Sequence, residues 1–174
     1  MKSSANAPLT WKTTFSFVAL ATLLVLLIGW LTSAGVLPIK RVIDYSDTEV
    51  KFIQVWIWLA IAIGLLLPGI AFFVWINRPE PRNILGFYLL VLIIQIVSEQ
   101  VVSSIWLASL VVPIGILYTA FRLWQLWQGQ KLIRTNTQLS RLNHTMMSGL
   151  LWLSILFWAS NLIMLLVLPL PSIL

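Results

Sequence analysis

Four long stretches of this chain contain no charged residue, and this feature most constrains what it can fold into. If His144 is neutral, the stretches are residues 13–39, 52–77, 100–121 and 142–174. A helix needs about 20 predominantly apolar residues to cross a hydrocarbon core about 30 Å thick. The stretches do not show the alternation of polar and apolar residues that the strands of a membrane barrel require. The chain is therefore predicted to be an all-α polytopic transmembrane helical bundle.

The composition supports the same class. Charged residues make up 9% of the chain and apolar residues 60%, whereas a soluble domain carries about 25% charged residues. So few charges cannot cover a surface that faces water. The net charge of +6 is interpreted as basic residues gathered at the cytoplasmic ends of spans, and nucleic acid is not an expected partner. The absence of cysteine excludes disulfides and thiolate-ligated metals.

The bundle is predicted to form a single transmembrane domain, residues 1–174, with about five spans. Residues 84–121 are the difficult segment, because a single helix of 38 residues would be about 57 Å long, too long for one span. We therefore expect a turn near residues 98–100, which makes spans 3 and 4 a short or re-entrant hairpin. The predicted spans are residues 14–36, 50–76, 84–100, 101–121 and 145–168, with a basic connector at 122–144.

The first apolar run has two interpretations. Lys2 and Lys12 precede the run Phe15–Leu31, and small residues follow it, which is also the outline of a secretory signal. The run has 17 residues, more than the roughly 7–15 of a signal core. A retained first span is therefore predicted, with a cleaved signal as the alternative.

Local signals mark helix boundaries. Ser46 and Glu49 have the spacing of a capping box just before an apolar run, and they predict the start of the second span. Proline 68, in Pro68-Gly69, removes a backbone donor and predicts an interruption of that span. The segment Asn77–Asn83 carries two prolines and is predicted to be a loop.

Charge in the connectors predicts the orientation. The connector 122–144 is basic and has no acidic residue, and both the N-terminus and the loop around residues 78–82 are also basic. Basic connectors are typical of the cytoplasmic side. The three assignments agree only if residues 84–121 leave and return to one side, so an N-in, C-out arrangement is predicted. Trp152 and Trp158 lie too deep in the last span to belong to an interfacial tryptophan belt.

One polar cluster lies within an apolar region. Glu99 is the acidic residue inside an apolar block, and Gln95 precedes it by one helical turn. An ionisable side chain at membrane depth often marks an ion or proton site. The alternative, which the predicted turn at this position favours, is that Glu99 caps an exposed outer turn. The candidate functional cluster comprises Gln95, Ser98, Glu99 and Gln100.

The basic connector combines cationic, tryptophan and leucine residues, a pattern typical of an amphipathic segment on the membrane surface. Gly129 is expected to break it into two pieces. Contact with anionic lipid is the predicted role, and docking of a partner protein is the alternative. The residues concerned are Arg122, Trp124, Trp127, Lys131, Arg134 and Arg141.

Catalytic patterns are missing from the sequence. One histidine, no cysteine and one intramembrane acid supply neither a paired-carboxylate site nor a metal cluster, and no glycine-rich phosphate loop is present. We therefore expect no enzymatic activity, no catalytic residue and no metal site. Small residues four apart are expected to let helices approach closely: Gly29 and Ser33, Ala60 and Gly64, and Ser104 and Ala108.

The functional hypothesis that follows is a non-enzymatic accessory subunit, or an assembly or scaffold factor, of a larger membrane complex. Its expected partners are the lipid bilayer and other membrane subunits or copies of itself. A small transporter or channel with Glu99 as ion-coupling residue is the alternative, and a pigment- or quinone-binding protein is the third. The expected location is an inner or plasma membrane, or an internal membrane such as the thylakoid.

Overall fold

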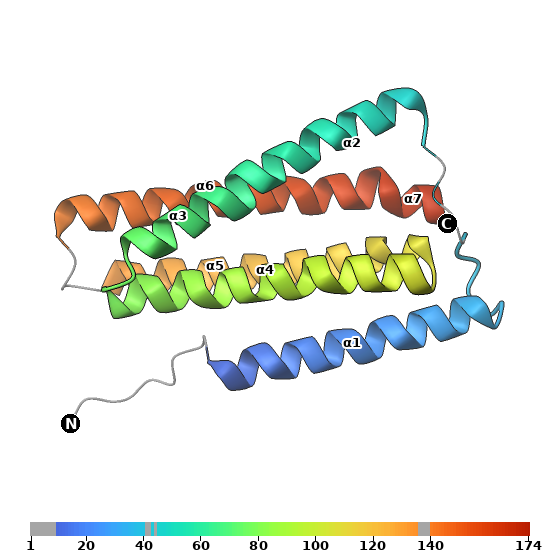
Figure 1. Ribbon diagram of the computed structural model, residues 1–174, viewed down its shortest axis with the longest axis horizontal. Helices are drawn as coiled ribbons and strands as arrows, with labels where there is room; N and C mark the ends of the chain where they lie inside the picture. Colours follow the sequence, from blue (N-terminus) through green and yellow to red (C-terminus); the bar gives the residue numbers. More distant parts are fainter. Residues whose placement is uncertain (1–9, 41–42, 44, 136–139) are drawn as a thin grey trace.

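Five long helical segments lie roughly parallel in the computed structural model of the chain (Figure 1). The structure describes residues 10–40, 43, 45–135 and 140–174. Within these residues each of the five segments is long and apolar enough to cross a membrane, and no strand is present. The protein is therefore a membrane-embedded helical protein. Its elements are α1 (Trp11–Ser33), α2 (Asp47–Leu59), η1 (Ala60–Leu66), α3 (Leu67–Val74), α4 (Pro79–Ile105), η2 (Ala108–Leu110), α5 (Val111–Thr135), α6 (Arg141–Val167) and α7 (Pro169–Ile173).

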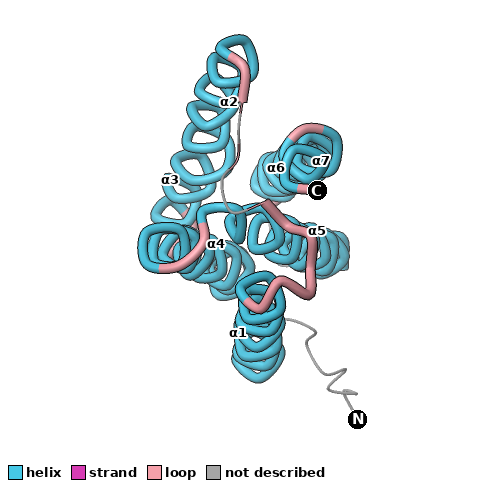
Figure 2. Tube along the Cα trace, turned by 90° about the vertical axis from the view of Figure 1, so that its right-hand side faces the viewer, coloured by secondary structure: helices cyan, strands magenta, loops and turns pink. Residues whose placement is uncertain are grey.

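Helix α5 is at the centre of the bundle. It packs against α1, α4 and α6, and the view along the bundle shows α1 and the α2–α3 segment on opposite sides of the α4–α5 pair (Figure 2). Helix α2 has no buried residue, and in Figure 2 it stands apart from α6 and α5. The segment at the start of the second span is therefore the most loosely held of the long helices.

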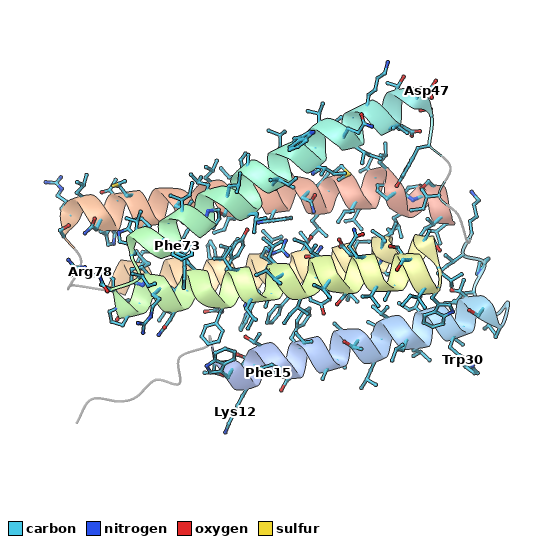
Figure 3. All side chains as sticks on the ribbon, in the orientation of Figure 1. Lys12, Phe15, Trp30, Asp47, Phe73 and Arg78 are labelled. Atoms are coloured by element: carbon cyan, nitrogen blue, oxygen red, sulfur yellow. The ribbon has the colours of Figure 1, made fainter. Side chains whose placement is uncertain are left out.

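The connectors group at the two ends as the charge pattern predicts. Helices α1, α4 and α6 begin at one end of the bundle, where α3 and α5 terminate (Figure 1); we call this the basic end. Lys12 and Arg78 lie toward it, whereas Trp30 and Asp47 lie toward the opposite end (Figure 3). The predicted return of the chain to its side of origin is confirmed, but it is completed at the end of α5, Thr135, and not at residue 121. Which end faces the cytoplasm stays a prediction.

The turn predicted near residues 98–100 is wrong. Helix α4 continues to Ile105, and the chain turns at Trp106 and Leu107, where Leu107 has an extended backbone. No glycine or proline lies at 98–100, and the side chain of Gln95 donates to Glu99 across one helical turn at 2.7 Å, which supports the helix there. With 27 residues in α4 and 25 in α5, both are long enough for full spans and are not short arms.

The prediction of a basic connector at residues 122–144 is also wrong. Helix α5 runs through most of it to Thr135, and α6 begins at Arg141. Gly129 does not break the helix; it lies against Ile84 of α4, so closely that an added Cβ would come within 2.7 Å of the Ile84 Cγ2 atom. Three polar residues of this segment, Arg122, Gln125 and Gln130, are buried in the bundle, whereas Lys131 and Arg134 are exposed. The other predicted spans begin and end within five residues of the observed helices, at Trp11–Ser33, Asp47–Val74 and Arg141–Ile173.

The local signals in the second span have clear structural counterparts. The capping box is confirmed: the Ser46 N–H donates to the Glu49 carboxylate at 2.8 Å, and the Glu49 N–H donates to the Ser46 hydroxyl at 3.4 Å. Ahead of Pro68 the chain passes into a π-helix, η1, and the Leu67 N–H bonds the Ala62 carbonyl. A proline removes the donor for the carbonyl four residues earlier, so the interruption that the sequence predicts is present. The loop before α4 is shorter than predicted, because Pro79 starts that helix.

Small residues that were expected to let helix backbones approach closely, such as Gly29 and Gly64, lie against tryptophan rings instead. A Cβ added at Gly29 would come within 2.5 Å of the Trp106 ring, and the Trp106 indole N–H donates to the Ser33 hydroxyl at 3.1 Å. The Trp106 side chain thus packs against Gly29 and bonds Ser33 on α1. Ser104 and Ala108 are not a helical pair, because the turn at 106–107 separates them.

The close packing of Gly29 against Trp106 leads to a first stability prediction. Gly29→Ala will lower the free energy of unfolding by about 1–3 kcal/mol, the usual effect of overpacking, because the methyl group meets the Trp106 ring. Gly149→Ala is the matched control, since Gly149 is also helical and nothing lies within 4 Å of an added Cβ; it will leave the stability unchanged or raise it by up to about 1 kcal/mol. Unfolding in mixed detergent micelles measures both, and equal effects of the two substitutions would contradict the packing described.

Candidate functional site

A buried arginine lies near the middle of α5 and is the centre of the candidate site. Arg122 is fully buried, although a cation at membrane depth is costly unless it is paired. One of its terminal N–H groups donates to the Gln95 side-chain oxygen. The Gln95 amide in turn donates to a Glu99 carboxyl oxygen at 2.7 Å. A directed chain of hydrogen bonds therefore joins Arg122 of α5 to Glu99 of α4 through Gln95.

Aromatic rings provide further compensation for the guanidinium charge. The Arg122 Cζ atom lies 3.9 Å from the centroid of the Trp158 ring and 5.7 Å from that of Tyr88. A cation over an aromatic face in a desolvated site gains about 2 kcal/mol or more. The Nε and Nη1 atoms of Arg122 are buried and have no hydrogen-bond partner among the described residues. The Trp158 ring of α6 thus stabilises the Arg122 cation, and the hydrogen bond to Gln95 orients it.

Tyr88 links this site to the π-helical segment. Its hydroxyl donates to the Gly64 carbonyl, and it accepts from the Trp158 indole N–H at 2.8 Å. Gly64 lies four residues before Pro68, which has no N–H to offer that carbonyl. A Cβ at Gly64 would come within 2.6 Å of the Trp158 ring. The proline therefore leaves an acceptor in the second span, and Tyr88 of α4 supplies its donor.

A second polar chain connects α2 to the bundle. The Trp56 indole N–H donates to the Asn161 side-chain oxygen at 2.7 Å, and the Asn161 amide donates to the Thr119 hydroxyl at 3.3 Å. The Trp56 ring also stacks on Phe157, with centroids 5.6 Å apart. Trp56 is thus the main attachment of an otherwise exposed helix.

The two polar chains border one large cavity. Its volume is about 660 Å³, and its walls come from α2, η1, α4, α5 and α6. Most lining side chains are aliphatic, including Ile61, Leu92 and Leu165. Along α6 it extends from Trp158 to Pro169 beyond the helix end, about 16 Å at 1.5 Å per residue. The cavity therefore occupies the half of the bundle away from the basic end. Its polar lining residues include Tyr45, Gln95, Glu99, Gln100 and Asn161.

The structure brings together only part of the polar cluster predicted at 95–100. Gln95, Glu99 and Gln100 line the large cavity. Ser98 lines a smaller cavity of about 270 Å³ between α1, α4 and α5. The interpretation of Glu99 as the cap of an exposed turn is wrong, because Glu99 lies within α4, bonded to a buried glutamine.

The residues predicted to lie on the membrane surface are also found in different environments. Arg122 is interior because its helix continues past it, and its hydrogen bond to Gln95 links it to the cavity lining. Trp124 stacks near Phe121 with centroids 5.2 Å apart and is partly buried. Lys131 lies over the exposed Trp127 ring, 5.9 Å from its centroid. Arg134 and Arg141 are exposed near the basic end, and their contact with lipid headgroups stays a prediction.

Tyr88 and Trp158 were missed as site residues, although the sequence holds a signal for each. The carbonyl freed by Pro68 requires a donor from elsewhere in the bundle, and Tyr88 is a buried donor on the next helix. Trp158 does not fit an interfacial belt, and it is 4% exposed inside the bundle. A tryptophan at that depth needs a partner for its N–H and offers a ring face to a cation.

Neither a metal site nor a known relative defines this site. Among the described residues no group of three or more histidine, cysteine or acidic side chains is placed to hold a metal ion. No protein-family model, curated protein or solved structure matches the chain.

Proposed function

We propose that this protein is a non-enzymatic membrane-embedded binding protein that takes an apolar molecule from the bilayer into the cavity between α2, α4, α5 and α6. The observation that carries the proposal is the cavity itself. Ligand sites in proteins are concave, mostly apolar spaces of about 300–1,000 Å³ with a few placed polar groups. A volume of about 660 Å³ with aliphatic walls and Glu99 and Asn161 in its lining fits that description.

The position of α2 supports access from the side. Ile57 of α2 and Ile96 of α4 both line the cavity and are 51% and 40% exposed. Both belong to apolar parts of spans, so the surface there faces lipid rather than water. The attachment of α2 through Trp56 leaves the rest of that helix free of buried contacts. We therefore place the mouth of the cavity between α2 and α4.

This proposal develops the third functional hypothesis, a pigment- or quinone-binding protein, without specifying either ligand. A role as accessory or assembly subunit stays a prediction and is compatible with ligand binding. The alternative of an ion-coupled transporter gains one observation, since Glu99 lines the cavity. Loss of ion flux in liposomes on Glu99→Gln, without loss of apolar-ligand binding, would favour that alternative.

Filling the cavity tests the proposal. Met164→Trp places an indole in the cavity wall, whereas Ile163→Trp, one residue away on α6, places it on an outward face that is 62% exposed and does not line the cavity. Each protein is purified in mild detergent, its bound molecules are extracted with organic solvent, and they are quantified by mass spectrometry. We expect one apolar molecule in near-stoichiometric amount with wild type and Ile163→Trp, reduced at least tenfold with Met164→Trp. Equal amounts with the two variants, or none with wild type, would contradict cavity binding.

A further inference from the structure

We propose that the cavity selects an uncharged lipid alcohol, whose hydroxyl donates a hydrogen bond to Glu99. This inference rests on the proposed binding function and names the ligand class for the same cavity. It depends on three features: the direction of the hydrogen-bond chain, the charge balance of the site, and the shape of the cavity around Glu99.

The hydrogen-bond chain from Arg122 through Gln95 runs in one direction, so Glu99, the group at its cavity end, is an acceptor. Arg122 has only donors, so the Gln95 oxygen must accept from it and the Gln95 amide must donate onward to Glu99. Glu99 thereby uses one carboxyl oxygen for Gln95. Its other oxygen has no partner among the described residues, and Glu99 lines the cavity. A ligand head that donates a hydrogen bond satisfies this oxygen, and a head that only accepts does not.

The charge balance selects a neutral head. Arg122 is permanently cationic, and Glu99 is the acidic residue, among those described, that lies beyond the first turn of its helix. The two charges cancel. An amine head would leave the site with a net positive charge at membrane depth, and a carboxylate head would leave it with a net negative charge, and both are costly in the membrane interior. A hydroxyl adds a donor and no charge.

The cavity leaves room for a small head beside Glu99 and an apolar body beyond it. Gly115 of α5 faces Glu99, and a Cβ added there would lie 3.6 Å from Oε1, the oxygen that accepts from Gln95, so the missing side chain at Gly115 leaves this carboxyl group uncovered. The remaining wall toward α2 and α6 is formed by side chains such as Ile61 and Leu165. The arrangement fits a molecule with one hydroxyl and a long or polycyclic hydrocarbon body. The surrounding phospholipids carry charged heads and lack this combination.

Three photoreactive probes with the same hexadecyl chain and the same mid-chain diazirine test the inference: the alcohol, its methyl ether and the carboxylic acid. Wild-type protein in nanodiscs is cross-linked over a range of probe concentrations, and the labelling of Met164→Trp is subtracted as the bilayer background. A hydrogen bond to a charged group contributes about 1.5–3 kcal/mol, so we expect the alcohol to half-saturate at a concentration at least about tenfold lower than the ether. The acid should bind no better than the ether.

Glu99→Gln tests the residue assigned to the head. Its amide presents both a donor and an acceptor and removes the negative charge, so the preference for alcohol over ether will fall to within about threefold. Binding of the acid will improve because Arg122 then lacks its counter-charge. Ser104→Ala is the control: Ser104 is an exposed polar residue of the same helix, its hydroxyl bonds the Val101 carbonyl, and it does not line the cavity, so the alcohol preference will persist.

The outcomes separate the two proposals. If no probe labels wild type above the Met164→Trp background, the binding function itself fails. If all three probes label equally and the background is low, the cavity binds apolar molecules but the head-group inference is overturned. An unchanged alcohol preference in Glu99→Gln overturns the role of Glu99. If Glu99→Gln does not fold, the ratio of alcohol to ether in wild type still decides.

Discussion

Arg122→Met will lower the free energy of unfolding by about 3–5 kcal/mol, the usual effect of removing one partner of a buried charge pair. The substitution leaves the Gln95 oxygen without its donor and Glu99 without its counter-charge. It also removes the cation that lies 3.9 Å from the Trp158 ring centroid. Reversible unfolding in mixed micelles, followed by circular dichroism, measures the loss.

Two further variants give this prediction its specificity. Arg134→Met removes an exposed arginine from the same helix, and it will change the stability by no more than about 0.5 kcal/mol. In the double variant Arg122→Met with Glu99→Gln, no buried charge remains unpaired. It will therefore recover at least about half of the lost stability, as replacement of a whole buried pair usually does. If Arg122→Met were as stable as Arg134→Met, the buried pair would not hold the bundle together.

The architecture of the protein was predictable because it depends on features that the sequence displays directly. Uncharged stretches such as residues 13–39 and 52–77 predict membrane helices by their length and apolar composition. The Ser46–Glu49 box specifies a helix start through local hydrogen bonds. The grouping of basic residues in several connectors led to the correct return of the chain through α4 and α5, although the return ends at Thr135 and not at residue 121. None of these signals requires knowledge of what packs against a helix.

The site was not predictable to the same degree, because the role of each of its residues depends on the side chains that pack against it. Arg122 looks like a helix-end arginine until Gln95 and Trp158 are placed beside it. Glu99 looks like a turn residue because polar residues surround it in sequence, yet α4 continues past it. Gly129 looks like a helix breaker, although its role is to admit Ile84. In each case tertiary packing overrides the local signal.

Tyr88→Phe will lower the free energy of unfolding by about 2 kcal/mol or more, because one hydroxyl serves two buried groups. Its loss removes the donor to the Gly64 carbonyl and the acceptor for the Trp158 indole, and an orphaned buried polar group costs about 1–3 kcal/mol. Tyr118→Phe is the control. Tyr118 is equally buried, but its hydroxyl interacts with Ser98, and a helical serine can turn to the carbonyl one helical turn earlier; we expect a loss below about 1 kcal/mol.

A double-mutant cycle with Pro68→Ala identifies the cause of that loss. Alanine at position 68 restores a backbone N–H, which can donate to the Gly64 carbonyl as in a regular α-helix. Tyr88 then has only the Trp158 indole to serve, so Tyr88→Phe will be less damaging in the Pro68→Ala background, by about 1 kcal/mol. Unfolding free energies of the four proteins in the same micelles give this coupling. Additive effects would mean that Tyr88 does not substitute for the missing proline donor, and that the π-helical segment ahead of Pro68 is stabilised by other contacts.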